Sequence, residues 1–345
     1  MSSKGMSEII NSLFKALSER QRDVLVGRFG LDKAKEPQTL AALGERFHVT
    51  RERIRQIEMS ALAAAREGVA TNADCREIIT AVKACLKKNG GVARVAPLLE
   101  HLHAVIRDLN ENQLAFLVAA SREVQSRPED DEYHPFYYSD ERSMKAATSF
   151  ATGWIETLRK NKGTILGGRY QELLQKSAAA KHLTLPVAAT YVGLSKHIHA
   201  NPFGDVGLGE WPEIRPATVR DQIYLVLKKH SKPLHFQTIA ATINDIGLHP
   251  HRALAPTVHN ELIKDPRFVL VGRGIYGLSE HGYQPGTARE VIQRILKNQG
   301  PLKPKDVILA VQRERFLKAN TVLVNLQNRN HFERLTDGSY QVREA

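Results

Sequence analysis

The amino-acid sequence predicts a mainly α-helical protein, in which an N-terminal helix-turn-helix is followed by tandem winged-helix modules with short β-hairpin wings. Three observations lead to this. Apolar residues recur at helical spacing between Gly and Pro interruptions. A block of three helical segments and a strand pair occurs twice near the C-terminus. The net charge of +12 suits a polyanionic partner, most commonly the nucleic-acid backbone, although a merely soluble basic protein has the same property.

The helix-turn-helix is predicted between residues 39 and 66. Its first helix carries Leu40, Leu43 and Phe47 on one face, and its second carries Ile54, Ile57 and Ala61. Thr50 between them is a good N-cap, because its hydroxyl accepts from a free amide of the first turn. A helix that begins in this way can place its first turns in a DNA major groove.

The exposed side of the second helix has the side chains that read bases. Arg pairs with guanine, Gln with adenine, and Glu accepts from cytosine. The alternative is a solvated helix face held by Arg–Glu pairs. The candidate DNA-binding residues are Thr50, Arg51, Glu52, Arg53, Arg55 and Gln56.

The segments LSERQRDVLVGRFGLD (Leu17–Asp32) and TLAALGERFHVTRERIRQIEMSALAAAR (Thr39–Arg66) resemble region 4 of primary, sigma-70-type sigma factors. The resemblance implies binding to an upstream promoter element, with base contacts from Arg51, Glu52 and Gln56 and backbone contacts from Arg53 and Arg55. It also implies docking on the flap of core RNA polymerase by the helix that contains Val24, Leu25 and Phe29.

Fewer than twenty residues precede this segment. Primary sigma factors melt DNA with an earlier, aromatic-bearing region, so the resemblance implies a protein without a strand-melting region of its own. It is expected to bind promoter-type duplex DNA and to act in initiation as something other than a complete sigma factor.

Two winged-helix-like modules are predicted in the middle of the chain, after a first domain of residues 1–70. In residues 73–140, helices are expected at 78–86, 95–103 and 113–124, with an extended aromatic piece behind them. Residues 146–214 are expected to repeat this plan, with a Gly-Gly break at Gly167-Gly168 and a third helix over 185–199. Three apolar helices and an aromatic tail could also arise without duplication.

The repeat is clearer in residues 217–283 and 286–345. Thr218 and Thr287 each open a helix with an acidic residue three positions on, which is a capping box. From Thr257 and Thr321 onward the two copies align without a gap. Each ends in two strands, joined at Gly272–Gly274 or at Asp337-Gly338, and Asp-Gly favours a two-residue hairpin turn.

The first copy resembles the HARE-HTH domain, which also occurs at the N-terminus of the RNA polymerase delta subunit, through Thr218–Asn244 and the following PTVHNELIKDPRFVLVGRGIYGL. The third helix and wing of a winged helix can meet DNA, and HARE domains are also linked to protein docking. The possible secondary DNA-binding residues are His259, Asn260, Lys264, Arg267 and Arg273, with Asn325, Asn328, Arg329 and Arg334 in the second copy.

Catalytic and metal chemistry find little support in the sequence. The histidine clusters at 197–199 and 249–251 lack the regularly spaced acidic or Cys ligands of a zinc site, and Cys75 and Cys85 suit ordinary thiols of a reducing cytosol. No phosphate loop and no apolar run of membrane-spanning length is present. We therefore expect no cofactor, no metal, no membrane, no small-molecule substrate and no enzymatic activity.

The sequence thus favours a bacterial, cytoplasmic and nucleoid-associated transcription protein that binds double-stranded DNA and associates with RNA polymerase core. Two alternatives stay open. One is a docking regulator that resembles the delta subunit, and the other is an accessory DNA-binding protein of a restriction or modification system. The DNA target sequence, the oligomeric state and the sign of the regulation do not follow from these patterns.

Overall fold

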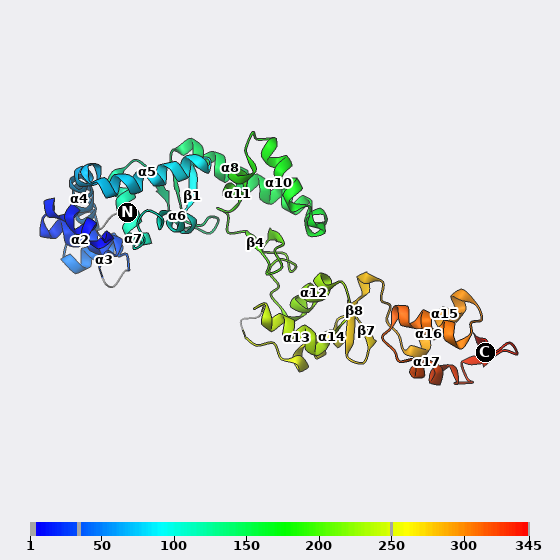
Figure 1. Ribbon diagram of the computed structural model, residues 1–345. Coiled ribbons are helices and arrows are strands. Elements are labelled where there is room, and N and C mark those ends of the chain that lie inside the picture. Colours follow the sequence, from blue (N-terminus) through cyan, green and yellow to red (C-terminus); the bar gives the residue numbers. More distant parts are fainter. Residues whose placement is uncertain (1–4, 33–35, 249–250, 344–345) are drawn as a thin grey trace. The chain divides into compact units, whose positions relative to one another are not determined.

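The computed structural model describes residues 5–32, 36–248 and 251–343, which fold into two compact units (Figure 1). Unit 1 is Met1–Ile198 and unit 2 is His199–Ala345. Both are mainly helical with small antiparallel sheets, so the predicted fold class is confirmed.

Unit 1 contains helices for most of its length and one three-stranded sheet. Its elements are, in order, α1 (Met6–Leu13), η1 (Phe14–Ala16), α2 (Glu19–Phe29), α3 (Leu40–Phe47), α4 (Arg51–Thr71), α5 (Ala73–Lys88), β1 (Val92–Arg94), α6 (Val95–Leu102), α7 (Glu111–Ser121), β2 (Gln125–Arg127), β3 (Phe136–Tyr138), α8 (Glu141–Lys160), α9 (Lys162–Thr164), η2 (Ile165–Arg169), α10 (Tyr170–Ala179) and α11 (Leu185–Val192).

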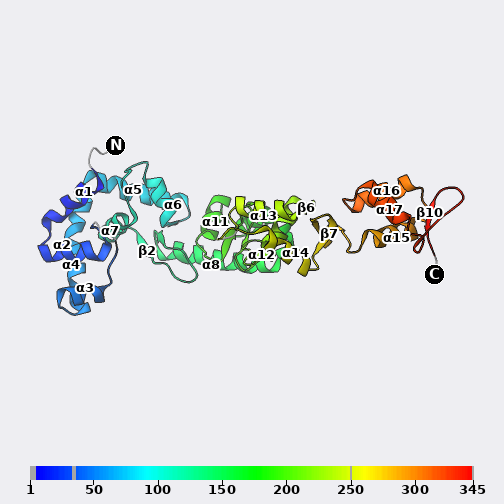
Figure 2. The ribbon, with the colours of Figure 1, turned by 90° about the horizontal axis from the view of Figure 1, so that it is seen from below.

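Helix α4 belongs to two hydrophobic cores. Its first turns bury Ile54 in a small core with Val24 of α2 and Leu43 of α3. Farther along, Ala61 and Ala65 enter the main core of unit 1, which extends from α1 to β3. Both views of the ribbon show α2, α3 and α4 gathered together (Figures 1 and 2). The predicted boundary between residues 70 and 73 therefore does not separate two cores.

Helices α5, α6 and α7 and the strands around them follow the winged-helix order. Strand β3 lies between β1 and β2 and is antiparallel to both, with Tyr137 paired to Ala93 on one side and to Ser126 on the other. The helices expected at 78–86, 95–103 and 113–124 correspond to α5, α6 and α7, and the expected extended piece contains β3.

The predicted module of residues 146–214 does not form one compact body. Its third helix, α11, ends at Val192 rather than at His199, because the next residues bond to a neighbouring loop: His134 N donates to Leu194 O and Lys196 N donates to Glu132 O. The strands that follow, β4 (Ile198–Ala200) and β5 (Val206–Leu208), lead into unit 2. The expected Gly-Gly break is present, since Gly168 has a φ of 87° between α9 and α10.

Unit 2 contains two successive blocks, each with three helices followed by a strand pair, and the first block has an additional short strand, β6 (Leu234–His235), and the 3-10 turn η3 (Ser279–His281). Their elements are, in order, α12 (Val219–His230), β6, α13 (Phe236–Asp245), α14 (Ala255–Lys264), β7 (Phe268–Gly272), β8 (Ile275–Leu278) and η3, and then α15 (Ala288–Gln299), α16 (Pro304–Glu314), α17 (Ala319–Leu326), β9 (Phe332–Arg334) and β10 (Tyr340–Val342).

The two hairpin wings differ in their turns. Gly272 pairs with Ile275, so Arg273 and Gly274 make the two-residue turn of the first wing. In the second wing Leu335 N donates to Ser339 O, which leaves a three-residue loop of Thr336, Asp337 and Gly338. The two-residue turn expected at Asp337-Gly338 is therefore wrong. Gly338, with a φ of 84°, ends a three-residue loop, the next most common kind of hairpin connection.

The turn of the helix-turn-helix requires a glycine at position 44. A Cβ there would lie 2.7 Å from the backbone oxygen of Val49, closer than real contacts allow. We therefore predict that Gly44→Ala lowers the free energy of unfolding by about 1–3 kcal/mol, because the backbone must shift to admit the methyl group.

Gly153→Ala is the matched control for this prediction. Gly153 lies within α8, and nothing lies within 4 Å of its ideal Cβ, so the substitution should add about 0.5–1 kcal/mol through helix propensity. Urea unfolding followed by far-ultraviolet circular dichroism measures both. If both substitutions change the stability equally, the close contact between position 44 and the backbone oxygen of Val49 does not limit the choice of residue there.

Candidate nucleic-acid interface

The turn between α3 and α4 is fixed by backbone bonds. His48 adopts a left-handed conformation at the end of α3, with a φ of 54°, and Val49 N donates to Gly44 O at 2.9 Å. The Thr50 hydroxyl then accepts from Arg53 N at 3.2 Å and caps α4. The N-cap role predicted for Thr50 is therefore confirmed.

The predicted base-reading side chains all lie on the exposed side of α4. Arg51, Glu52, Arg53, Arg55 and Gln56 are each exposed, and Ile54 between them is fully buried. Later elements of unit 1 pack on the second half of α4 and not on these first turns. The first two turns of α4 are thus open within unit 1.

These side chains hold one another in place by pairs three residues apart. Arg55 contacts Glu52 through Nη2 at 2.7 Å and Nε at 2.9 Å, and Arg53 Nη1 donates to Gln56 Oε1 at 3.1 Å. The hydrogen bond from Arg55 lowers the pKa of Glu52, and the same bond raises the pKa of Arg55. Such exposed pairs contribute little stability. They can be exchanged for contacts to a ligand at small cost.

Arg51 differs from its neighbours. Its side chain is exposed, and among the described residues no hydrogen bond or ion pair holds it. It is the first residue of α4. A bidentate donor in this position suits an acceptor pair on a base edge.

One ion pair that supports this surface was missed in the sequence. Arg28 of α2 contacts Glu58 of α4 at 3.1 Å and also donates to Gln38 O at 3.1 Å. The Glu58 side chain is 15% exposed, so the contact is sheltered. Thirty residues separate the partners, and no local pattern indicates that they meet.

Of the residues predicted to dock on polymerase, Val24 and Leu25 are not available on the surface and Phe29 is partly buried. Val24 and Leu25 are fully buried, Val24 in the helix-turn-helix core and Leu25 in the main core. Phe29 packs edge-on against Phe116 of α7, with the ring centroids 5.7 Å apart. Val24 and Leu25 therefore present no exposed side chain to a partner in this structure.

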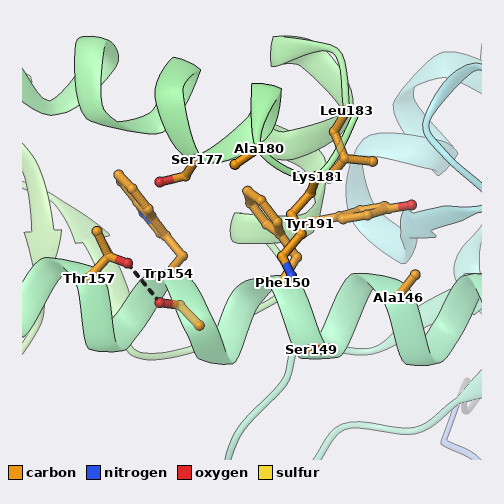
Figure 3. Close-up of a pocket in the computed structure, with 11 residues that line it drawn as sticks. Ala146, Ser149, Phe150, Trp154, Thr157, Ser177, Ala180, Lys181, Leu183 and Tyr191 are labelled. Carbon is orange, nitrogen blue, oxygen red and sulfur yellow. Dashed lines mark hydrogen bonds between the residues drawn. The ribbon is translucent and has the colours of Figure 1, made fainter.

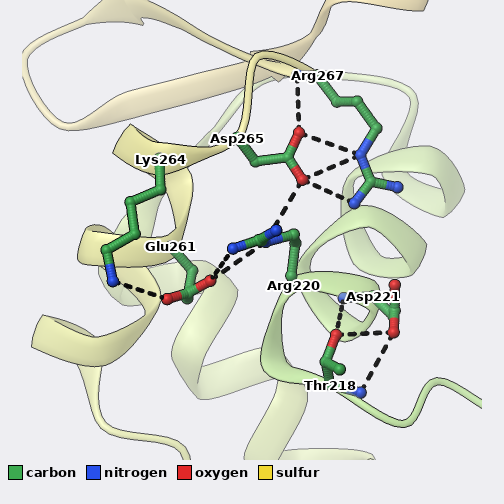
Figure 4. A network of polar contacts seen from close by, with 7 residues as sticks. All are labelled: Thr218, Arg220, Asp221, Glu261, Lys264, Asp265 and Arg267. Atoms are coloured by element: carbon green, nitrogen blue, oxygen red, sulfur yellow. Dashed lines mark hydrogen bonds and ion pairs between the residues drawn. The ribbon is translucent and has the colours of Figure 1, made fainter.

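The secondary site predicted in unit 2 is largely neutralised by its own carboxylates (Figure 4). Arg267 contacts the buried Asp265 at 2.7 Å, Arg220 contacts Glu261 at 2.8 Å, and Lys264 contacts Glu261 at 3.3 Å. Of the predicted residues, His259 stacks on Phe236 with a centroid distance of 4.6 Å, whereas Asn260 and Arg273 are exposed. The structure places these five residues on α14, the loop after it and the wing.

A separate cavity of about 550 Å³ lies among α8, α10 and α11 (Figure 3). Phe150, Trp154 and Tyr191 form its aromatic walls, and Ser177 and Lys181 lie on its other side. None of the residues predicted from the sequence lines it. Its lining suits an apolar group and offers no catalytic arrangement.

The histidine clusters and cysteines noted in the sequence have local surroundings of their own where the structure describes them. His197 Nε2 lies 2.9 Å from Glu132 Oε2, and His249 lies outside the described residues. Cys75 is buried, which raises the pKa of its thiol to about 12. Within the part of the chain that the structure describes, no group of three His, Cys, Asp or Glu side chains could hold a metal ion. The helices described include none that is long and apolar enough to cross a membrane.

Comparison with known proteins identifies the first segment. Residues 13–67 match the family model described as Sigma-70, region 4. The chain is 49% identical over 57 residues to the RNA polymerase sigma factor SigA1 of Synechococcus elongatus, and equally so to SigA of Nostoc sp.. It is 47% identical over 57 residues to SigA of a Bacillus species. The resemblance to sigma-70 region 4 is therefore confirmed for this segment.

The match is confined to a small part of each protein. It covers 16% of this chain and 14% of the Synechococcus and Nostoc proteins, or 15% of the Bacillus protein. Residues beyond 67 lie outside it, so the likeness of residues 217–283 to the HARE-HTH domain stays a prediction. The matched segment contains α2, α3 and the first 17 residues of α4, and with them every candidate base-reading residue.

The paired carboxylate of Asp265 should make unit 2 sensitive to acid. The hydrogen bond from Arg267 lowers the pKa of Asp265, so folding is favoured by this group above its unfolded pKa of about 3.9. That contribution is lost as the pH falls through the lower, folded value. We predict that Asp265→Asn destabilises the protein at pH 7 and reduces the loss of stability between pH 7 and pH 3.5.

Urea unfolding at the two pH values measures this effect. Asp245→Asn serves as the control, because Asp245 is exposed at the end of α13 and has no ion pair among the described residues. If the Asp265→Asn variant and the wild type lose the same stability between pH 7 and pH 3.5, Asp265 is not the source of the acid sensitivity.

Proposed function

We propose that this protein is a sequence-specific DNA-binding transcription factor that reads promoter-type duplex DNA with the first turns of α4. The observation that carries the proposal is the open surface of Arg51, Glu52, Arg53, Arg55 and Gln56 on a helix whose other side is buried. The match of residues 13–67 to sigma-70 region 4 supports it.

Each side chain has a distinct part in the proposed contact. Arg51, Glu52 and Gln56 approach base edges in the major groove, where their donors and acceptors match guanine, cytosine and adenine. Arg53 and Arg55 neutralise backbone phosphates, and Thr50 sets the start of the helix. Binding requires that the Arg55–Glu52 and Arg53–Gln56 pairs open, which is inexpensive for exposed side chains.

We further propose that the protein associates with RNA polymerase core, acts in transcription initiation in the bacterial cytoplasm, and works by binding rather than by catalysis. The relatives it matches are RNA polymerase sigma factors. Because Val24 and Leu25 are buried, the contact is expected on other residues, among them the exposed Arg22 and Asp23 of α2.

A second candidate function is a polymerase-docking regulator that uses unit 2. It is favoured by the exposed apolar residues Ile263 and Leu270, which are 64% and 51% exposed beside cations already paired with carboxylates. Retention of core polymerase on the immobilised protein without DNA, unchanged by Arg51→Ala and Gln56→Ala, would favour it. The third reading, a restriction or modification accessory protein, would require binding that depends on DNA methylation.

Arg51→Ala tests base reading directly. We predict that it lowers discrimination between the preferred site and a single-base variant at the contacted position by about 1–3 kcal/mol, because a bidentate contact is lost. Selection from a random duplex pool first identifies the preferred site, and competition by fluorescence anisotropy then measures the discrimination.

Arg107→Ala is the matched control for loss of charge. Arg107 is exposed after α6, away from the helix-turn-helix sequence, and should leave discrimination unchanged. Equal affinity of the wild-type protein for all sequences would argue against base reading. Equal discrimination by wild type and Arg51→Ala would exclude Arg51 from it.

A further inference from the structure

The C-terminal block of unit 2 has a recess of about 650 Å³ between the end of α17 and the wing. Three arginines border it: Arg329 follows α17, Arg334 ends β9, and Arg343 follows β10. Phe332 and Tyr340 form its apolar floor, and Phe332 is 2% exposed in the core of the block. The recess therefore has an apolar floor that is anchored in the core of the block, and three exposed arginines stand around it.

Two hydrogen bonds made by Arg343 bring it beside Arg329. Arg343 N donates to His331 O at 2.9 Å and its Nη1 donates to Arg329 O at 3.0 Å, which brings the chain after β10 beside residue 329. Arg334 lies directly across the strands from Tyr340. Among the described residues, no carboxylate forms an ion pair with any of the three guanidinium groups.

One acidic residue lines the recess beside the three arginines. Glu333 lies between Phe332 and Arg334 on β9. There its Oε2 accepts from Gln341 Nε2 at 3.2 Å. The three arginines thus keep a net positive charge at the mouth of the recess.

In the preceding block, by contrast, carboxylates neutralise the cations near the end of the third helix. At the corresponding end of α14, Lys264 and Arg267 are neutralised by Glu261 and by Asp265, which is only 6% exposed (Figure 4). An anion would have to displace these contacts in the first block. In the second block it would meet three exposed arginines with which no carboxylate of the described residues forms an ion pair.

We propose that this arginine recess, bordered by Arg329, Arg334 and Arg343, is a second nucleic-acid site that binds backbone phosphates of duplex DNA without reading its sequence. The proposal rests on DNA binding by the same chain through α4. Guanidinium forks suit phosphate oxygens, with which they form two parallel hydrogen bonds. The recess adds affinity to the duplex that α4 selects.

The test is the salt dependence of DNA binding by the full-length protein. Each phosphate contact contributes about 0.9 to the slope of log K against log salt concentration. The triple variant Arg329→Gln, Arg334→Gln, Arg343→Gln should reduce the magnitude of that slope by about 2–3, on the preferred site and on an unrelated duplex alike. Discrimination between the two duplexes should stay unchanged.

Two further variants make the outcome unambiguous. The triple Arg→Lys variant keeps the charges and should retain most of the slope, and circular dichroism checks that each variant is folded. The double variant Lys297→Gln, Lys305→Gln removes exposed cations of the same block outside the recess and should change the slope less.

Failure of this proposal is distinguishable from failure of the proposed function. An unchanged slope in the Arg→Gln variant, with discrimination intact, overturns the recess as a phosphate site and leaves α4 in its role. That result is also expected if the recess binds an acidic protein instead. If the wild-type protein does not bind duplex DNA at all, both proposals are overturned.

Discussion

The 21-residue helix α4 is the element on which the rest of unit 1 depends, because its two halves are buried in different cores. Ile54 fixes the first half against Val24 and Leu43, and Ala61 and Ala65 fix the second half in the main core. Small residues in that second half let α7 approach closely. A single rigid rod, about 30 Å long, therefore joins the exposed arginines to the winged-helix block behind them.

The residues expected to meet polymerase are buried in two different ways. Val24 is buried inside the helix-turn-helix by Leu43 and Ile54. Leu25 lies in the main core, and Phe29 packs against Phe116 of α7. The covering element lies beyond residue 67, where the match to sigma-70 region 4 ends.

Local patterns predicted those parts of the structure that depend on local physics. The N-cap at Thr50 and the inward face at Ile54 follow from neighbouring residues, and so do the capping boxes at Thr218 and Thr287. The end of α11 was missed, because the bonds of residues 194–196 to residues 132–134 pull the chain out of the helix. Ion pairs such as Arg28–Glu58 join distant residues and leave no local pattern.

The continuity of α4 also limits how this chain can change by insertion or deletion. Each residue of an α-helix advances the direction of the following side chains by about 100°. One added residue between Glu58 and Ala61 would turn the outward arginines toward the protein or turn the inward alanines toward water. We therefore expect insertions to be tolerated in loops such as residues 128–132 and not within this helix, where they would change the direction of Arg51, Arg53 and Arg55 relative to α7.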